Sequence, residues 1–146
     1  MDIAIIADDL KKELMCQFCI AYCGILSKHR ICATATTGKY IATQTGLKIE
    51  CVLPGFHGGV QQLLSRIAYN EIDMLIYFRD YQQTDPRIID TDQNLLKTCD
   101  KHDVPFATNL ATAEILINAL DRGDIDWRNL LNPRSEVNRS RRFQVK

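Results

Sequence analysis

The sequence predicts an α/β fold in which a single domain is doubly wound around a mainly five-stranded parallel sheet. Along the chain, short apolar runs typical of buried strands alternate with stretches whose apolar residues have helical spacing. This alternation is typical of parallel sheets that carry helices on both faces. The chain has 146 residues, 46% of them hydrophobic, and no linker or low-complexity run divides it, so we expect one domain with a substantial core.

Five short segments have the composition of strands. Residues 3–7 and 74–78 are continuous apolar runs, as in strands that are buried on both faces. Residues 48–53 instead alternate between polar and apolar side chains. The predicted strands cover residues 3–7, 31–34, 48–53, 74–78 and 105–108.

Each predicted strand is followed by a predicted helix. The first helix has Asp9 as its N-cap, and a turn over residues 36–38 precedes the second. Asn109 caps the last helix in this prediction, and Gly46 and Gly123 end the second and the last. The predicted helices have apolar stripes over residues 14–26, 39–45, 59–70, 91–102 and 110–122.

The charges of the chain balance, with 18 Lys and Arg residues against 18 Asp and Glu residues. We therefore expect no nucleic acid and no membrane among its partners. The balance hides an asymmetry, because residues 127–146 hold six basic residues against one acidic residue. We predict a domain over residues 1–130 followed by a basic C-terminal arm over residues 131–146.

No stretch of the sequence has the features of a targeting signal, and no apolar run approaches the roughly 18 residues of a membrane span. We expect a cytoplasmic protein. The six cysteines are scattered through predicted strands and helices, which indicates reduced core residues rather than a disulfide framework. Cys16, Cys19 and Cys23 share one side of the first helix, but no fourth ligand accompanies them, so we predict no metal site.

Polar residues follow the predicted strands. The carboxyl ends of parallel strands meet at one edge of the sheet, where such folds bind ligands. The predicted rim contains Asp8, Asp9, Lys12, Thr34, Thr36, Thr37, Gly38, residues 54–59, Asp80 and Asn109. Hydroxyls, glycine N–H groups and a lysine together suit a phosphate, although a threonine-rich turn that only caps a helix has the same composition.

The loop over residues 53–62 is the clearest part of this rim. Its glycines, Gly55, Gly58 and Gly59, let main-chain N–H groups approach an anion, and the following helix directs its positive end to the same place. The next residue is the apolar Val60. The chain has neither a Walker motif nor a G-x-G-x-x-G after the first strand, so we expect no nucleotide cofactor.

Six separated segments resemble the methylglyoxal synthase family. They occur in the family's order, cover roughly residues 2–130 and make the resemblance specific. The segments are IAIIADD at residues 3–9, ATATTG at 33–38, PGFHGG at 54–59, IYFRD at 76–80, PFATNLATA at 105–113 and RGDIDWR at 122–128.

The resemblance implies a homo-oligomer, typically a hexamer, that converts dihydroxyacetone phosphate to methylglyoxal and inorganic phosphate. Such a carbon–oxygen lyase needs a carboxylate to take a carbon-bound proton, donors to hold the enediolate and a cradle that releases phosphate. The family's phosphate contacts match Lys12, Thr34, Thr36, Thr37 and Gly55. Its acidic active-site positions match Asp9, Asp80 and Asp90. Our predicted cradle also includes the backbones of Gly38, Gly58 and Gly59.

The chain departs from the family at four of its site positions. The catalytic aspartate that follows the two glycines is replaced by Val60, which cannot accept a proton. Arg87 and Asp8 stand where the family has histidines, and Pro54 replaces a serine and removes a backbone donor. The loss of a base and a proton shuttle is expected to cost more than the roughly 10²- to 10⁴-fold of one general acid or base.

Three functions follow from this mixture. The first is a site for phosphate or a small phosphorylated metabolite with little or no synthase turnover. The second is an active synthase with a relocated base, in which Asp8, Asp9, Asp80 and Asp90 crowd one pocket and raise the pKa of one member. The third is a regulatory module that senses an effector.

The basic arm also has two interpretations. Arg139, Arg141 and Arg142 reach the anion site of a neighbouring subunit, or the arm is a disordered tail.

Overall fold

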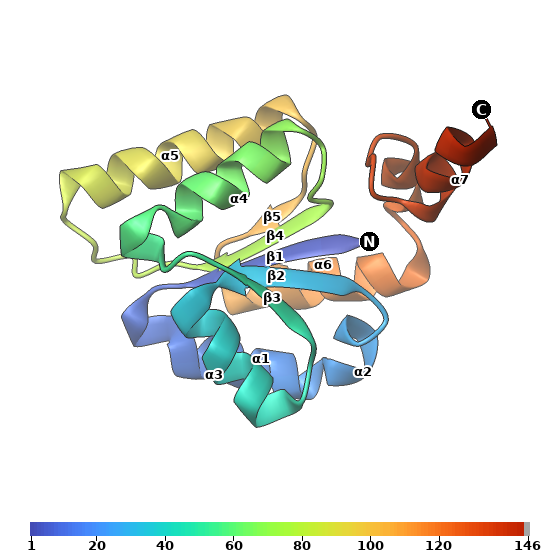
Figure 1. Ribbon diagram of the computed structural model, residues 1–146. Coiled ribbons are helices and arrows are strands. Elements are labelled where there is room, and N and C mark those ends of the chain that lie inside the picture. The colour runs from blue at the N-terminus through green and yellow to red at the C-terminus, as the bar shows by residue number, and fades with distance from the viewer. Residues whose placement is uncertain (145–146) are drawn as a thin grey trace.

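The computed structural model describes residues 1–144, which fold around a five-stranded parallel sheet (Figure 1). The strands are β1 (Asp2–Ala7), β2 (Arg30–Thr34), β3 (Ile49–Val52), β4 (Met74–Phe78) and β5 (Phe106–Ala107). They lie in the order β3-β2-β1-β4-β5 and every neighbouring pair is parallel. The predicted doubly wound α/β fold is confirmed.

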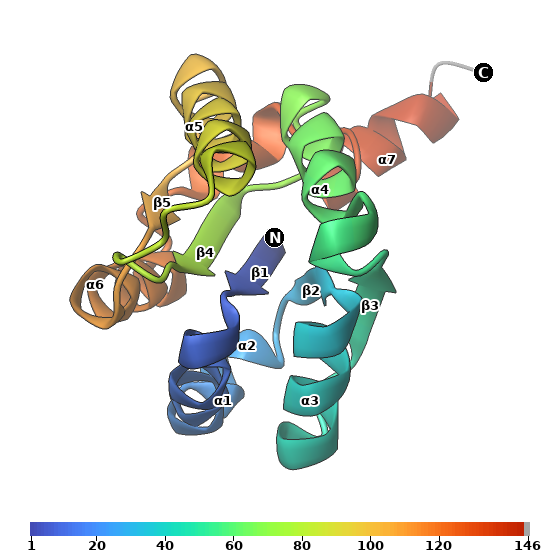
Figure 2. The same cartoon turned by 90° about the vertical axis from the view of Figure 1, so that its left-hand side faces the viewer.

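Helices cover both faces of this sheet. The α-helices are α1 (Lys12–Ala21), α2 (Cys23–Leu26), α3 (Ala35–Thr45), α4 (Gly59–Ala68), α5 (Pro86–Lys101), α6 (Leu110–Arg122) and α7 (Glu136–Gln144). Three 3₁₀ helices connect them, η1 (Asp9–Lys11), η2 (Gly55–His57) and η3 (Asp126–Leu130). Figure 2 shows α1, α3 and α6 on one face and α4 and α5 on the other, and each face has its own buried apolar cluster. In the part of the chain that the structure describes, no helix is long and apolar enough to cross a membrane.

The strand order reverses beside β1. The chain builds outward from β1 through β2 to β3, then returns to the other side of β1 for β4 and β5. The loops after β1, β2, β3 and β4 therefore converge at the carboxyl edge of the sheet, and a crevice opens where neighbouring loops leave toward opposite faces.

The prediction of a turn over residues 36–38 is wrong. Helix α3 begins at Ala35, so Thr36, Thr37 and Gly38 form its first turn, and Thr34 is the extended residue before it. The reason is packing, because Gly38 lies against β3, where an added Cβ would stand 2.7 Å from the sulfur of Cys51. The helix end at Gly46, whose φ is 74°, is confirmed.

Two other helix starts also differ from the prediction. Helix α5 begins at Pro86 rather than at residue 91, because Asp85 caps it by accepting a hydrogen bond from the backbone N–H of Arg87 and proline suits the first helical position. Asp9 is not an N-cap but lies inside η1, which follows the extended Asp8. The prediction that Asn109 caps α6 and that Gly123 ends it is confirmed.

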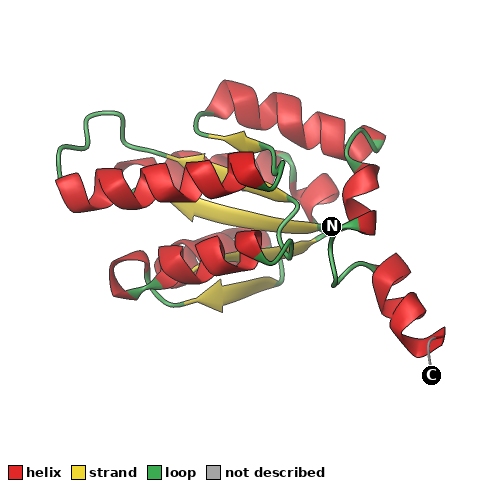
Figure 3. Ribbon diagram, turned by 90° about the horizontal axis from the view of Figure 1, so that it is seen from above, coloured by secondary structure: helices red, strands yellow, loops and turns green. Residues whose placement is uncertain are grey.

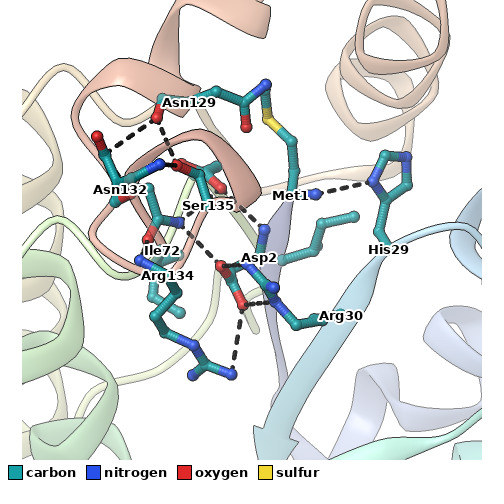
Figure 4. Close-up of polar contacts among 12 residues, drawn as sticks. Met1, Asp2, His29, Arg30, Ile72, Asn129, Asn132, Arg134 and Ser135 are labelled. Carbon is teal, nitrogen blue, oxygen red and sulfur yellow. Dashed lines mark hydrogen bonds and ion pairs between the residues drawn. The ribbon is translucent and has the colours of Figure 1, made fainter. Parts of the chain in front are cut away.

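The basic arm is helical over α7 and is held at the amino ends of the strands (Figures 1 and 3). Asn132 donates to carboxylate oxygens of Asp2 (2.8 Å) and Asp73 (2.9 Å), which lie at the starts of β1 and β4. Asp2 also forms two hydrogen bonds with the guanidinium of Arg30, at 2.8 and 2.7 Å (Figure 4). The interpretation of the arm as a disordered tail is therefore wrong for residues 136–144, while Lys146 lies outside the described residues.

One of the six basic residues in the C-terminal stretch is a core residue. Arg128 is completely buried, and its Nε lies 3.2 Å from Oδ1 of Asp73. Its remaining nitrogens donate to three backbone carbonyls, those of Ile72, His102 and Asp103, at 3.0–3.1 Å. Arg128 thus joins the C-terminal segment to the sheet and does not belong to an exposed basic surface.

Candidate functional site

A pocket of about 590 Å³ opens at the carboxyl edge of the sheet, at the reversal in strand order. Residues that follow β1, β2, β3 and β4 line it together, so loops that are distant in the sequence converge on one space. This volume falls within the roughly 300–1,000 Å³ typical of small-molecule sites. The pocket therefore lies at the edge of the sheet where the sequence predicts the site.

Five of the predicted phosphate contacts line this pocket, namely Lys12, Thr34, Thr36, Thr37 and Gly55. Thr34 and Thr37 are buried, and no side chain caps α3 at Thr34. The amide N–H groups of the first turn of α3 therefore remain as donors next to two hydroxyl groups. Lys12, whose Nζ lies 2.6 Å from Oδ1 of Asp9, adds a cation to the lining of the same cavity. This set of donors suits a phosphate.

The other three predicted glycines do not line the pocket, and each has a packing or backbone role. Gly38 permits the contact of α3 with β3, and Gly58 has a φ of 98°, which side chains rarely adopt. A Cβ on Gly59 would stand 1.9 Å from the carbonyl oxygen of Leu53. These glycines shape the loop, and Gly55 alone among the four reaches the cavity.

Three of the four candidate carboxylates line the pocket. Asp8 accepts hydrogen bonds from the Tyr77 hydroxyl (3.1 Å) and from the backbone N–H of Asp80 (2.7 Å), which fixes its orientation. Asp9 and Asp80 also line the cavity. Asp90 does not, since it is exposed on α5 outside the lining.

Two of the four substituted positions, Val60 and Arg87, also line the pocket. Val60 is 9% exposed in the first turn of α4, where its side chain faces both the cavity and an apolar cluster. Arg87 lines the cavity from the first turn of α5 with a side chain that is 92% exposed. The pocket therefore has an apolar side chain at one expected catalytic position and a long cationic side chain at the other.

Sequence reasoning missed Asp92 and Tyr77, both of which line the pocket and are buried. Burial raises the pKa of Asp92, and the nearby charge of Asp8 raises it further, while the hydroxyl of Tyr77 acts in the opposite direction. Asp92 stands three and seven residues before the buried Leu95 and Cys99 of α5. A carboxylate on that apolar stripe was the signal that could have revealed it.

The six cysteines are free, and Cys16, Cys19, Cys32 and Cys99 are buried, as predicted for core residues. Burial raises the pKa of the Cys19 thiol to about 12. Cys51 differs from the prediction, because it is exposed on the edge strand β3.

Comparisons with known proteins agree with this fold. A family model described as the MGS-like domain matches residues 16–108. Methylglyoxal synthase of Caldicellulosiruptor saccharolyticus is 55% identical over 140 residues, which cover 96% of this chain and 99% of that protein. Methylglyoxal synthase of Oceanobacillus iheyensis is 48% identical over 136 residues, which cover 93% of this chain and 96% of that protein.

A solved structure supports the same similarity. The crystal structure of methylglyoxal synthase from Elizabethkingia anophelis NUHP1 has a TM-score of 0.71 to this chain at 33% sequence identity. The match covers 80% of this chain and 76% of that chain. The similarity thus extends over most of the sheet and its helices.

Proposed function

Because the chain belongs to the methylglyoxal synthase family, we propose that its pocket binds the phosphate group of a small phosphorylated metabolite, with low synthase turnover. The observation that carries this proposal is the contrast within one cavity. Lys12, Thr34, Thr36, Thr37 and Gly55 line it together, whereas Val60 occupies the position where the family resemblance implies a base. Phosphate binding needs the first group of residues. Proton abstraction from carbon needs a base such as a carboxylate, and Val60 has none.

A second candidate is an active synthase, a carbon–oxygen lyase acting on phosphates, with a relocated base. This candidate is supported by the carboxylates of Asp8, Asp9, Asp80 and Asp92 around the same cavity. The two candidates share the phosphate cradle and differ only in turnover. Binding and product formation must therefore be measured separately.

We expect Lys12→Met to weaken phosphate binding by about 10- to 100-fold, because a hydrogen bond to a charged partner contributes roughly 1.5–3 kcal/mol. The rise in melting temperature with inorganic phosphate and with dihydroxyacetone phosphate reports the affinity of the folded protein. Adding nucleotides to the same screen tests for a regulatory module, which would prefer one of them.

Lys39→Met is the matched control, since Lys39 is exposed on α3 and lies outside the cavity lining. It removes the same charge, so its phosphate affinity is expected to equal that of the unaltered protein. Equal affinities of Lys12→Met and Lys39→Met would contradict the assignment of the cradle.

We also propose that copies of the chain associate, as a hexamer, and that the arm of one copy serves the pocket of another. Within one chain, α7 lies at the amino ends of the strands and the pocket at their carboxyl ends, so the arm is at the wrong end to serve its own pocket (Figure 1). Arg139, Arg141 and Arg142 are exposed on α7, which leaves their charges available to a second copy.

Replacing these three arginines with serine is expected to weaken phosphate binding severalfold, because three cations would leave the neighbouring anion site. Replacing the exposed Lys39, Lys48 and Lys97 with serine removes the same charge elsewhere and serves as the control. Sedimentation velocity gives the oligomeric state of each variant. A monomer in solution, or unchanged phosphate affinity in the arginine variant, would contradict this proposal.

A further inference from the structure

Asp92 lies at a junction between two cavities. It is 8% exposed and lines both the 590 Å³ pocket and a neighbouring pocket of about 480 Å³ that extends toward the start of α6. Helix α5, which carries Asp92, covers the same face of the sheet as α4, which carries Val60. Asp92 therefore supplies a carboxylate to the cavity from the same face of the sheet on which Val60 replaces the expected one.

Two of the other carboxylates at the cavity already have partners that fix them. Both oxygens of Asp8 accept hydrogen bonds, from Tyr77 and from the backbone of Asp80. Asp9 is paired with Lys12 at 2.6 Å, and its side chain is 71% exposed. The charge of Asp9 is therefore already balanced by a cation.

The next two carboxylates are engaged by backbone donors. Asp80 accepts from the N–H of Gln82 at 2.9 Å, and Asp85 accepts from the N–H of Arg87 as the cap of α5. Within residues 1–144, Asp92 has neither an ion-pair partner nor a backbone donor. It is the buried carboxylate that keeps its oxygens available to a ligand.

The surroundings of Asp92 also raise its pKa, so that its protonated form is favoured more than that of an exposed aspartate. Burial contributes most, and the adjacent negative charge of Asp8 adds to it. The Tyr77 hydroxyl, which also donates to Asp8 at 3.1 Å, opposes these effects, as does the positive charge of Arg79. A carboxylate that binds a proton more strongly is a better acceptor of a proton from carbon.

We propose that Asp92 is a catalytic residue that exchanges a proton with the hydroxymethyl carbon of a bound triose phosphate. This inference rests on the proposed function, since the cradle must hold the phosphate. The carbon–hydrogen bond breaks and its proton moves to an oxygen of Asp92. Its electron pair forms a double bond to the carbonyl carbon, and the carbonyl π pair moves to oxygen to give an enediolate. Reversal restores the ketone, and in deuterated water the carbon gains deuterium.

The test is deuterium incorporation into dihydroxyacetone phosphate, followed by proton NMR in deuterated water. We expect Asp92→Asn to slow enzyme-dependent exchange by about 10²-fold or more, with unchanged affinity for inorganic phosphate. Asp100→Asn, an exposed substitution on the same helix, is the control and is expected to exchange at the unaltered rate. A contaminating isomerase would give the same exchange rate in all preparations. Equal exchange rates in Asp92→Asn and Asp100→Asn would therefore show that exchange does not depend on Asp92, and would overturn the inference.

A pH profile separates a chemical role of Asp92 from a structural one. Exchange is expected to rise with pH as Asp92 loses its proton, with a midpoint above the ordinary 3.8 of aspartate. Tyr77→Phe keeps the ring but removes the hydroxyl that lowers the pKa of Asp92, so the midpoint should move to higher pH. This shift decides the question even where Asp92→Asn fails to fold, and an unmoved midpoint overturns the inference.

Binding results separate this inference from the function on which it rests. Dihydroxyacetone phosphate that binds without any exchange overturns the role of Asp92 and leaves the binding function intact. Absence of binding by both phosphate and dihydroxyacetone phosphate overturns the proposed function and the inference with it.

Discussion

Val60→Asp is expected to raise methylglyoxal formation from dihydroxyacetone phosphate by about 10²- to 10⁴-fold, the range that one general base contributes. Val60 lines the cavity in the first turn of α4, so a carboxylate at this position would enter the space that the phosphate cradle also faces. The positive end of α4 would keep that carboxylate ionised, as a base must be, and an acidic residue suits the first turn of a helix.

The matched control is Val60→Asn, which has nearly the same shape as the aspartate variant but cannot take a proton. Methylglyoxal is measured after a single turnover and in the steady state, together with the affinity for phosphate. If Val60→Asp forms no more product than Val60→Asn while both bind phosphate, the prediction is wrong. The pocket has then diverged more widely, and Asp8 and Arg87 are the next positions to restore.

The sequence was sufficient to predict the strands that local composition determines. Residues 74–78 are an unbroken apolar run between polar residues, and the structure has β4 over Met74–Phe78. Helix α6 was predicted to the residue because Asn109 and Gly123 are local signals that require no knowledge of the remaining chain.

The errors arose where packing overrides a local signal. Threonines and a glycine at residues 36–38 are typical of a turn, yet they form the first turn of α3 because Gly38 lets that helix approach β3. The early start of α5 was available from the sequence, since aspartate followed by proline at residues 85–86 is a regular helix beginning.

The location of the pocket was predictable, while its most buried carboxylate was not. The rule that ligands bind at the carboxyl edge of a parallel sheet requires only the strand order along the chain. The burial of Asp92 depends on the rotation of α5 about its axis and on which side chains of β4 lie beneath it. Those features are set by packing between elements rather than by any motif.

Arg128 illustrates the same limit for charge, because sequence alone counts it among the exposed basic residues of the C-terminus. Its ion-pair partner, Asp73, precedes it by 55 residues, and no local pattern links the two. Asp73 in turn accepts from Asn132 and from the backbone N–H of Asp2. Arg128 and Asn132 therefore fasten the C-terminal segment to the starts of two central strands.

Arg128→Met is accordingly expected to lower the free energy of unfolding by about 3–5 kcal/mol, the usual cost of removing one partner from a buried ion pair. The substitution leaves Asp73 buried without its cation and three backbone carbonyls without a donor. The melting temperature should fall by roughly 10 °C, and urea unfolding gives the free energy directly. Because the anchor of the arm is lost as well, α7 should become accessible to proteolysis before the sheet unfolds.

Two further variants determine whether burial causes this loss. Arg122→Met breaks an ion pair with Asp124 whose side chains are 63% and 49% exposed, and it should cost less than about 1 kcal/mol. Arg128→Lys keeps the charge near Asp73 but replaces a guanidinium that reaches three carbonyls by a single ammonium. Its loss in free energy of unfolding should therefore lie between those of Arg128→Met and Arg122→Met. Equal stabilities of Arg128→Met and Arg122→Met would show that the buried pair contributes no more than a surface pair. The C-terminal segment would then depend on Asn132 and Arg134 for its attachment to Asp2 and Asp73.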